Sequence, residues 1–273
     1  MVILLTGASS GIGYETARML ALRGHKVYGA ARRVEKIEPL KEFGVVPLGM
    51  DVSDETSMQE GVQRIIDGEG RIDALVNNAG YGYFGAVENV TMEEARRQLD
   101  VNVFGLARLC QLVLPYMRGQ NFGRIVNLSS VAGRVVLPFG GWYHVSKFSV
   151  EALSDALRME VKPFGVRVSI IEPGGIKTAW GMIAADNLEC SSKGTVYEDA
   201  AAKEARLMRV GYTSKVLSRP EVISKAIIKA VEARRPRARY RTGRGSGILV
   251  FLHSILPCRW WDALMRSFVK IKI

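Results

Sequence analysis

The stretch VILLTGASSGIG at residues 2–13 opens the chain with an apolar run and follows it with a turn that holds three glycines. A short, near-continuous apolar run is typical of a β-strand that is buried on both faces. Glycines allow the tight turn that follows, and they let a ligand approach the backbone where the next helix begins. The stretch therefore predicts a strand, a turn and a helix N-terminus that could bind phosphate groups.

Apolar runs of the same kind recur as far as residue 173, with amphipathic segments between them. The further runs lie at residues 26–30, 45–50, 72–78, 123–130 and 166–173. The segments that are long enough for helices include 12–23, 54–67, 91–118 and 143–162. Strands and helices that alternate at this spacing predict right-handed βαβ units, and hence an α/β fold with a doubly wound parallel sheet and helices on both faces.

The organisation of the 273-residue chain changes after EPGG at 172–175. No linker rich in Pro, Gly and Ser divides the residues before it, so a single domain over residues 1–245 is the simplest arrangement. Residues 179–215 are irregular and helical, and a long insertion beyond a strand end in such a sheet is usually a substrate lid, so we expect a helical lid here. A helix is expected at 220–233. Residues 246–273 form an apolar and basic C-terminal extension.

The cysteines and the apolar runs indicate in which cellular compartment the protein is expected. Cys110, Cys190 and Cys258 are far apart and have no metal-ligand spacing, so they predict neither a disulfide framework nor a metal site. The apolar start lacks the features of a signal peptide, and no apolar run reaches the ~18 residues that span a bilayer. We therefore expect a cytoplasmic protein.

The net charge of +11 is concentrated at the C-terminal end of the chain. Residues 234–273 hold ten Lys and Arg and one acid, Asp262, which gives a net charge of +9. No recognised nucleic-acid module accompanies the arginines of RRPRARYRTGR at 234–244, so we expect no nucleic-acid partner and interpret these arginines as a solvated rim.

A second interpretation of the basic end is contact with an anionic membrane. The segment GILVFLHSILP at 247–257 is apolar, and the following segment has an apolar side and a basic side. The apolar side holds Trp261, Leu264, Met265 and Phe268, and the basic residues available for lipid head groups are Arg259, Arg266 and Lys270. The alternative is that both segments pack on the sheet or close the substrate cleft.

The glycine turn and the end of the second strand suggest a dinucleotide. Gly7, Gly11 and Gly13 have the spacing TGxxxGxG, which differs from the more usual GxGxxG, and a turn without a ligand is the alternative. Ala31 stands where an NAD-specific protein places an acid, and Arg32 and Arg33 follow it. A guanidinium can bind a 2′-phosphate that a carboxylate would repel, so NADP(H) is favoured. Arg33 could equally be solvated surface.

WYHVSK at 142–147 places Tyr143 and Lys147 one helical turn apart, so both side chains lie on one helix face. Lys147 could bind a nicotinamide ribose and, through its charge, lower the pKa of the Tyr143 phenol. The tyrosine would then be a usable proton donor and acceptor near neutral pH. Ser130 follows the fifth strand, at the sheet edge where ligands bind, and its hydroxyl could contact the substrate oxygen. Such a pair alone is usually structural.

Several motifs together resemble the short-chain dehydrogenase/reductase family over about residues 1–178. They are TGASSGIG at 6–13, NNAG at 77–80, DVNVFG at 100–105, VNLSS at 126–130, YHVSK at 143–147 and EPGGIKT at 172–178. The resemblance implies a Rossmann-type fold, a homo-oligomer (a dimer or tetramer) and a catalytic tetrad of Asn102, Ser130, Tyr143 and Lys147. Asn102 would hold a helix bend and a proton-relay water. The implied cofactor-binding residues are Gly7, Ser9, Ser10, Gly11, Ile12, Gly13, Arg32, Arg33, Asp51, Val52, Asn78, Ala79, Gly80, Tyr143, Lys147, Pro173, Gly174, Ile176 and Thr178.

Within that family, KFSVEALSDALRMEV and RPRARYRTG resemble the hydroxysteroid and retinol dehydrogenases and the acyl-dihydroxyacetone-phosphate reductases. We therefore expect an NADP(H)-dependent oxidoreductase that interconverts a ketone and a secondary alcohol on a small apolar, steroid- or lipid-like substrate. An apolar pocket could be lined by Phe139, Trp142, His144, Trp180 and Met182, although these side chains could also be core or a dimer contact. The alternative function is a noncatalytic NADP-sensing or scaffold protein on the same fold.

Overall fold

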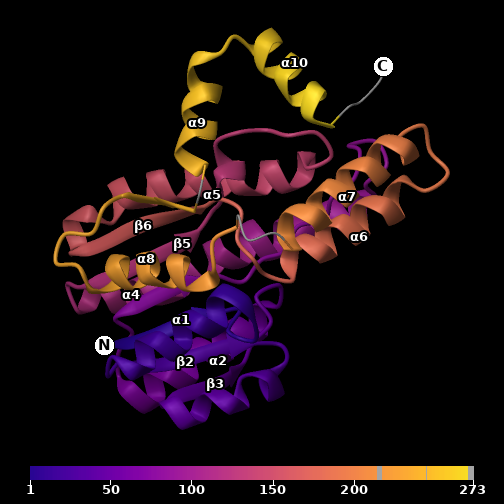
Figure 1. Cartoon of the computed structure of the whole chain (residues 1–273). Coiled ribbons are helices and arrows are strands. Elements are labelled where there is room, and N and C mark those ends of the chain that lie inside the picture. The colour runs from indigo at the N-terminus through magenta and orange to yellow at the C-terminus, as the bar shows by residue number, and fades with distance from the viewer. Residues whose placement is uncertain (214–216, 244, 270–273) are drawn as a thin grey trace.

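The chain folds around one parallel sheet (Figure 1). The computed structural model describes residues 1–213, 217–243 and 245–269, without the side chains of Thr213, Phe268 and Val269. The strand order is β3-β2-β1-β4-β5-β6-β7, and every neighbouring pair is parallel. The order reverses between β1 and β4, and ligands of such sheets bind in the crevice at this point, beyond the carboxyl ends of the strands. The strands are β1 (Val2–Thr6), β2 (Lys26–Ala31), β3 (Val45–Gly49), β4 (Ala74–Asn77), β5 (Gly123–Leu128), β6 (Val166–Pro173) and β7 (Arg239–Thr242).

Helices cover both faces of the sheet. α1 and α8 pack on one face, and α2, α4 and α5 pack on the other. The helices are α1 (Gly11–Leu22), α2 (Glu55–Glu69), α3 (Met92–Leu99), α4 (Gly105–Gly119), α5 (Gly141–Glu160), α6 (Trp180–Ser192), α7 (Glu198–Thr213), α8 (Pro220–Glu232), α9 (Ser246–Ile255) and α10 (Cys258–Val269). The α/β architecture expected from the sequence is confirmed.

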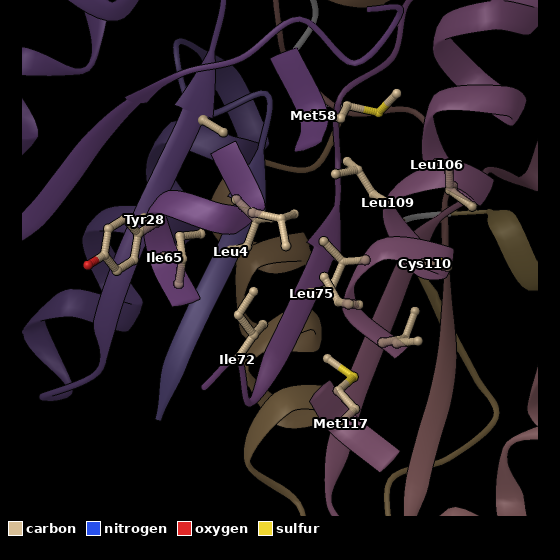
Figure 2. Packing of buried hydrophobic residues seen from close by; sticks show 14 of the residues in the cluster. Leu4, Tyr28, Met58, Ile65, Ile72, Leu75, Leu106, Leu109, Cys110 and Met117 are labelled. Atoms are coloured by element: carbon tan, nitrogen blue, oxygen red, sulfur yellow. The ribbon is translucent and has the colours of Figure 1, made fainter. Parts of the chain in front are cut away.

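The two cores follow from alternation along the buried strands. In β1, Leu4 belongs to the cluster beneath α2 and α4, whereas Ile3 and Leu5 belong to the cluster beneath α1 and α8. Successive side chains of a strand point to opposite faces, so an all-apolar strand supplies both clusters at once. Figure 2 shows the first cluster, in which Leu4 and Leu75 meet Ile65 of α2 and Leu109 of α4.

The helical segment at 91–118 is interrupted at the place where the resemblance implied a helix bend, at Asn102. α3 ends at Leu99, a π-helical turn follows at Asp100–Phe104, and α4 begins at Gly105. A Cβ at Gly105 would lie 2.0 Å from the carbonyl oxygen of Val52. The helix therefore passes close to the backbone that follows β3, and only glycine fits at the contact. Such π-helical turns often occur at functional sites.

The later part of the chain adds two helical pairs beside the sheet. α6 and α7 pack on each other, and α9 and α10 form a hairpin that stands above α5 in Figure 1. We define the α9–α10 hairpin as residues 246–269. Among the described residues, every helix is too short or too polar to cross a membrane. The division of the chain into residues 1–245 and 246–273 remains a prediction.

The apolar side of α10, which the membrane interpretation placed against lipid, packs inward, as the alternative interpretation had it. Trp261 and Met265 are only 5% and 6% exposed, and they form a cluster with Val135 and Val250. Leu264 packs at the edge of this cluster. Amphipathic spacing marks an apolar face, but the loop after Ser130 is what covers it here. The side chain of Phe268 lies outside the described residues, as does Lys270.

The arginines of 234–244 are also not a uniform solvated rim. Arg234, Arg235 and Arg237 are exposed, whereas Arg239 and Arg241 of β7 form ion pairs with acids beneath them. Arg244 lies outside the described residues. The charge of this stretch is therefore partly compensated inside the protein.

Candidate active site

The glycine-rich turn joins β1 to α1 in a conformation that favours glycine. Gly7 and Gly11 have φ angles of 71° and 56°. A Cβ at Gly13 would lie 2.2 Å from the carbonyl oxygen of Gly7, so the helix can pack on the turn only without a side chain there. The N-cap residue Ser10 makes no side-chain capping bond within this described segment. The first N–H groups of α1 can therefore donate to a phosphate. The turn also holds the other two expected residues, Ser9 and Ile12.

Hydrogen bonds tie the end of β4 to this turn. The Asn78 side chain donates to the carbonyl oxygens of Thr6 and Gly7 at 2.9 and 3.2 Å. The backbone N–H groups of Asn78 and Ala79 donate to Thr6 Oγ1 at 3.1 and 3.0 Å. Because β1 and β4 flank the reversal of strand order, these bonds fix the two walls of the crevice. Gly80 continues the β4 wall.

The adenosine end of the crevice lies beyond β2 and β3. Asp51 Oδ1 accepts hydrogen bonds from the N–H and the hydroxyl of Ser53 at 2.9 and 2.7 Å. Burial would raise the pKa of Asp51, but these bonds and the nearby charge of Arg32 outweigh it, so the pKa is lowered. Arg32 and Arg33 are exposed, and Val52 is buried. Arg32 and Asp51 thus stand together where this type of fold binds the adenosine ribose.

Tyr143 and Lys147 lie on one face of α5, as their spacing predicts. Tyr143 is only 8% exposed. Burial raises the pKa of its hydroxyl, and a hydrogen bond with Ser130 opposes that shift. The Lys147 nitrogen lies 5.8 Å from the centre of the Tyr143 ring. The pKa of Tyr143 is therefore raised, opposite to the lowering expected from the Lys147 charge, because burial is the largest effect.

Lys147 is itself a buried cation. Its ammonium group donates to the carbonyl oxygen of Leu128, the last residue of β5, at 2.9 Å. Burial lowers the pKa of Lys147 to about 8, and the negative charge of Glu151 opposes this shift. The side chain remains mostly protonated at pH 7, so it presents a positive charge inside the crevice.

Ser130 and Asn102 connect Tyr143 and Lys147 to neighbouring elements. Ser130 Oγ accepts from the N–H of Ala132 at 3.1 Å and donates to the carbonyl oxygen of Pro173 at 3.4 Å. Asn102 lies in the π-helical turn. Its side-chain N–H groups donate to the Tyr81 carbonyl at 2.8 Å and to Ser146 Oγ at 3.0 Å, and its Oδ1 accepts from the Tyr81 N–H at 3.0 Å.

The surroundings of Gly80 show that the side chains of Asn102 and Lys147 lie close together. A Cβ there would lie 2.9 Å from Asn102 Oδ1 and 3.8 Å from Lys147 Nζ. The structure thus brings all four expected catalytic residues together, from the loop after β5, the π-helical turn and α5. Their chemical roles remain proposals.

The turn after β6 closes the crevice from the side of the glycine turn. The Thr178 side chain lies 3.5 Å from the Cβ position of Gly11. The Gly174 N–H donates to the carbonyl oxygen of Thr242 at 2.7 Å, so the end of β7 holds this turn in place. The turn contains the residues expected at the nicotinamide: Pro173, Gly174, Ile176 and Thr178.

Two aromatic rings pack against Tyr143, and a third packs against one of them. The centre of the Trp180 ring is 5.0 Å and that of Phe84 is 5.7 Å from the Tyr143 ring. Tyr212 of α7 follows, 6.3 Å from Trp180. A Cβ at Gly82 would lie 2.4 Å from the Trp180 ring, so this glycine makes room for the indole. We call Phe84, Trp180 and Tyr212 the aromatic roof.

Sequence reasoning found Trp180 but missed Phe84 and Tyr212. Tyr212 gave no signal, because α7 brings it to the site from far along the chain. Phe84 lies in GYGYFG at 80–85, a stretch of alternating aromatics and glycines, and that pattern could have indicated close packing against a ring.

The other expected pocket residues have different surroundings. Phe139 is buried against α6 and α7. His144 is buried, with Nδ1 2.9 Å from the Ala132 carbonyl and Nε2 3.0 Å from the Leu137 N–H, so it holds the loop after Ser130 as a neutral ring. Burial lowers the pKa of His144. Trp142 is half-buried, and Met182 is exposed on α6.

Buried acids stand behind Lys147. Glu151 is one turn further along α5, and Glu172 lies in β6. Arg239 Nε is 3.1 Å from Glu151 and 3.2 Å from Glu172, and Arg241 Nε is 2.9 Å from Glu172. Burial raises the pKa of Glu151, and the charge of Arg239 is among the effects that oppose this shift. The arginines of β7 therefore compensate the negative charges of Glu151 in α5 and Glu172 in β6.

The motifs and this geometry agree with the comparison against protein families. Residues 1–188 match the family described as short chain dehydrogenase. The chain belongs to the short-chain dehydrogenase/reductase family. Its curated relatives also support an enzyme of that family. It is 40% identical over 266 residues to a probable short-chain type dehydrogenase/reductase, VdlC, of Helicobacter pylori, with 97% of each chain covered. It is 39% identical to the 3-ketodihydrosphingosine reductase of Bacteroides thetaiotaomicron, with 99% of this chain and 98% of the relative covered.

Solved structures show the same fold. A short-chain dehydrogenase from Streptomyces avermitilis superposes with a TM-score of 0.80 at 30% identity, covering 98% of this chain and 96% of that one. A serine dehydrogenase complexed with NADP+ superposes with a TM-score of 0.77 at 27% identity, covering 89% and 94%. A short-chain dehydrogenase/reductase from Burkholderia phymatum in complex with NAD gives 0.79 at 26% identity, covering 92% and 91%. Neighbours of this fold thus include proteins bound to either dinucleotide.

Proposed function

We propose that this enzyme is an NADP(H)-dependent oxidoreductase that interconverts a ketone and a secondary alcohol on an apolar, lipid- or steroid-like substrate. The observation that carries the proposal is the meeting of Tyr143, Ser130 and Lys147 beneath the aromatic roof. A proton donor, a hydroxyl that can stabilise an oxyanion and a buried cation surround one position at the carboxyl edge of the sheet.

Each of the four site residues has its own role in the proposed reaction. Tyr143 donates a proton to the ketone oxygen in reduction, or accepts one from the alcohol in oxidation. Ser130 Oγ stabilises the negative charge that develops on that oxygen. Lys147 binds ribose hydroxyls and compensates charge on the tyrosine, while Asn102 holds the π-helical turn and its amide beside Lys147. When bound, the nicotinamide supplies or receives the hydride.

The substrate class follows from the surroundings of Tyr143 and from one relative. The rings of Phe84, Trp180 and Tyr212 make the approach to the hydroxyl apolar, which suits a hydrocarbon chain or ring system better than a charged metabolite. The 3-ketodihydrosphingosine reductase among the relatives acts, by its name, on a long-chain ketone. We propose that the α6–α7 pair is the lid that closes over such a chain.

The proposed preference for NADP(H) rests on the end of β2. Ala31 takes the place of an acid, and Arg32 is near enough to Asp51 to lower the pKa of that carboxyl. A guanidinium at this position can form charge-assisted bonds to a 2′-phosphate. Arg33 is exposed beside it and is a second, weaker candidate for that contact.

We also propose a homo-oligomer, a dimer or a tetramer, in a cytoplasmic setting. The support for self-association is the exposure of Phe104, Val145 and Phe148 where α4 and α5 begin. Cys190 and Cys258 are exposed free thiols, which suits a reducing compartment. Light scattering after size-exclusion chromatography would measure the mass of the assembly.

The function is tested by following NADPH absorbance with a panel of ketones. The panel contains 3-ketodihydrosphingosine, a ketosteroid, a retinoid and short water-soluble ketones. We expect the long-chain or steroid ketone to have the highest kcat/KM, and NADPH to be preferred to NADH. Turnover confined to small polar ketones would contradict the substrate class. Tight NADPH binding with no turnover of any ketone would favour the sensor or scaffold alternative.

A further inference from the structure

The outer face of the α9–α10 hairpin carries large apolar side chains that no part of the described chain covers. Ile248, Phe251 and Ile255 are 68%, 61% and 57% exposed, and Trp260 is 70% exposed. Residues spaced three and four apart lie on one side of a helix, so the first three form a single row along α9. Trp260 adds an indole ring in the first turn of α10.

The inner face of the hairpin is packed and hydrogen-bonded, so the outer row has a defined direction. Val250 of α9 and Trp261 of α10 are buried against Val135. Trp261 Nε1 donates to the carbonyl oxygen of Val136 at 3.2 Å, and the His253 ring meets Trp261 edge-on at 4.8 Å. These contacts attach the hairpin to the domain, so the exposed row belongs to a firmly packed pair of helices.

The apolar row runs along α9 and continues to the tip of the hairpin. α9 ends at Ile255 and α10 begins at Cys258, so Ile255 and Trp260 flank the connection. Figure 1 shows this connection as the part of the hairpin that extends beyond the helices of the domain. Arg259 and Arg266 are exposed on α10, and Asp262 is the acid between them.

We infer that the α9–α10 hairpin docks on an anionic lipid surface, with Ile248, Phe251, Ile255 and Trp260 entering the boundary between head groups and acyl chains. Large apolar side chains on a helix that lies at a bilayer surface, with basic residues beside them, are the pattern of interfacial attachment. Tryptophan is enriched at that boundary because its ring is apolar and its N–H is polar. The net charge of +11 adds a long-range attraction to anionic lipid.

A second copy of the chain fits this surface less well. Two hairpins that met through the same face would bring Arg259 and Arg266 of each copy together, with like charges opposed. A projecting tip also offers little area to another rigid tip, whereas a bilayer deforms around it. The charge and the shape thus favour lipid over self-association.

The position of the hairpin connects docking to catalysis, a link that rests on the proposed function. Its inner face covers the loop after Ser130, and α10 contacts α7, which carries Tyr212 of the aromatic roof. A docked hairpin would hold the proposed lid beside the membrane. A long-chain ketone could then reach the site without crossing bulk water.

Vesicle flotation of the full chain, without substrate or NADPH, tests the docking surface. One set of vesicles is phosphatidylcholine alone, and the other contains phosphatidylcholine and phosphatidylglycerol. We expect stronger flotation with the anionic vesicles, reduced at high salt. The double variant Phe251→Ser with Trp260→Ser removes two exposed rings and should weaken partition roughly tenfold to a hundredfold. The matched control Leu22→Ser with Val222→Ser changes exposed apolar residues of α1 and α8 and should float like the wild type.

Quenching by brominated acyl chains locates the contact. We expect the wild type to lose tryptophan emission on brominated anionic vesicles and Trp260→Phe to lose far less. Equal flotation of both double variants, or no flotation on anionic vesicles at low salt, would overturn the inference. So would a concentration-dependent dimer that only the Phe251 and Trp260 variant dissociates. Reduction of a water-soluble ketone is measured separately, so failure of docking and failure of the proposed reaction are distinguishable.

Discussion

The carboxyl edge of the sheet buries polar side chains, whereas the α9–α10 hairpin exposes apolar ones. At the sheet edge, polar groups are buried and tied: Lys147 to Leu128, and Asn102 to Tyr81 and Ser146. On the hairpin, the polar contacts are few and large apolar groups such as Phe251 and Trp260 face outward. Burial of polar groups costs free energy unless each is paired, and exposure of apolar groups costs free energy unless something covers them. The first region therefore indicates chemistry, and the second indicates a partner outside the chain.

Among the variants that test this comparison, we expect the largest loss of activity from a substitution of Lys147. Lys147→Met keeps most of the length of the side chain but removes the buried charge beside Tyr143, so kcat/KM should fall by roughly 10² to 10⁴. NADPH affinity should fall as well, because the ribose contact is lost. Steady-state kinetics and cofactor titration measure both quantities. Lys162→Met, at an exposed lysine after α5, is the control, and an equal loss in both variants would contradict a role for Lys147 in the crevice.

The two neighbouring tryptophans of the hairpin separate its inner face from its outer face. Trp261→Ala removes a buried ring and the bond to Val136, and it should destabilise the hairpin by about 3 kcal/mol. Trp260→Ala removes an exposed ring and should change stability by less than about 0.5 kcal/mol. Hydrogen exchange over residues 246–267 compares the two variants directly. Equal protection in both would show that the inner face does not hold the hairpin in place.

Arg32→Ala tests the adenosine end of the crevice. A charge-assisted contact to phosphate contributes about 1.5–3 kcal/mol, so NADPH affinity should fall by roughly one to two decades. NADH affinity should change little, because NADH has no 2′-phosphate. Titrations that follow nicotinamide fluorescence measure both constants. Wild-type enzyme that binds the two cofactors equally would contradict the preference, whatever the variant does.

The smallest expected effect is a shift in the pH dependence of NADPH affinity when the Glu151 charge near Lys147 is removed. The ammonium form of Lys147 is present below its pKa of about 8, so NADPH affinity should be high below that pH and fall as the pH rises through it. The charge of Glu151 raises the pKa of Lys147, and Glu151→Gln should therefore move this fall to lower pH. Glu160→Gln, on an exposed residue of α5, should leave the midpoint unchanged. An unaltered midpoint in Glu151→Gln would exclude electrostatic support by Glu151.

The strands and the catalytic side chains could be predicted from sequence because their determinants are local. Buried strands are apolar runs, and Val166–Pro173 was expected at the same residues. Tyr143 and Lys147 share a helix face by spacing alone, and Gly13 marks a place where a Cβ would meet the backbone of Gly7. Such signals lie within a few residues of one another, so no knowledge of the tertiary fold is needed.

The remaining features depend on contacts between distant segments. Tyr212 reaches the roof through α7, and Arg239 meets Glu151 through the pairing of β7 with β6. The amphipathic pattern of α10 marked an apolar face, but it did not tell whether lipid or the loop at Val135 covers that face. The family resemblance implied a helix bend at Asn102, and the π-helical turn Asp100–Phe104 lies there, but the close approach of Gly105 to Val52 could not be predicted from local sequence.

The most direct test of the account is reduction of the best ketone of the panel by Tyr143→Phe in the presence of NADPH. The substitution removes one oxygen and keeps the ring beneath Trp180, so the fold and the NADPH affinity should stay near their wild-type values. Turnover should fall by about 10² to 10⁴, because the group that transfers the proton is gone. Turnover near the wild-type rate on that ketone would contradict the central claim that Tyr143 is the proton donor of a ketone reductase.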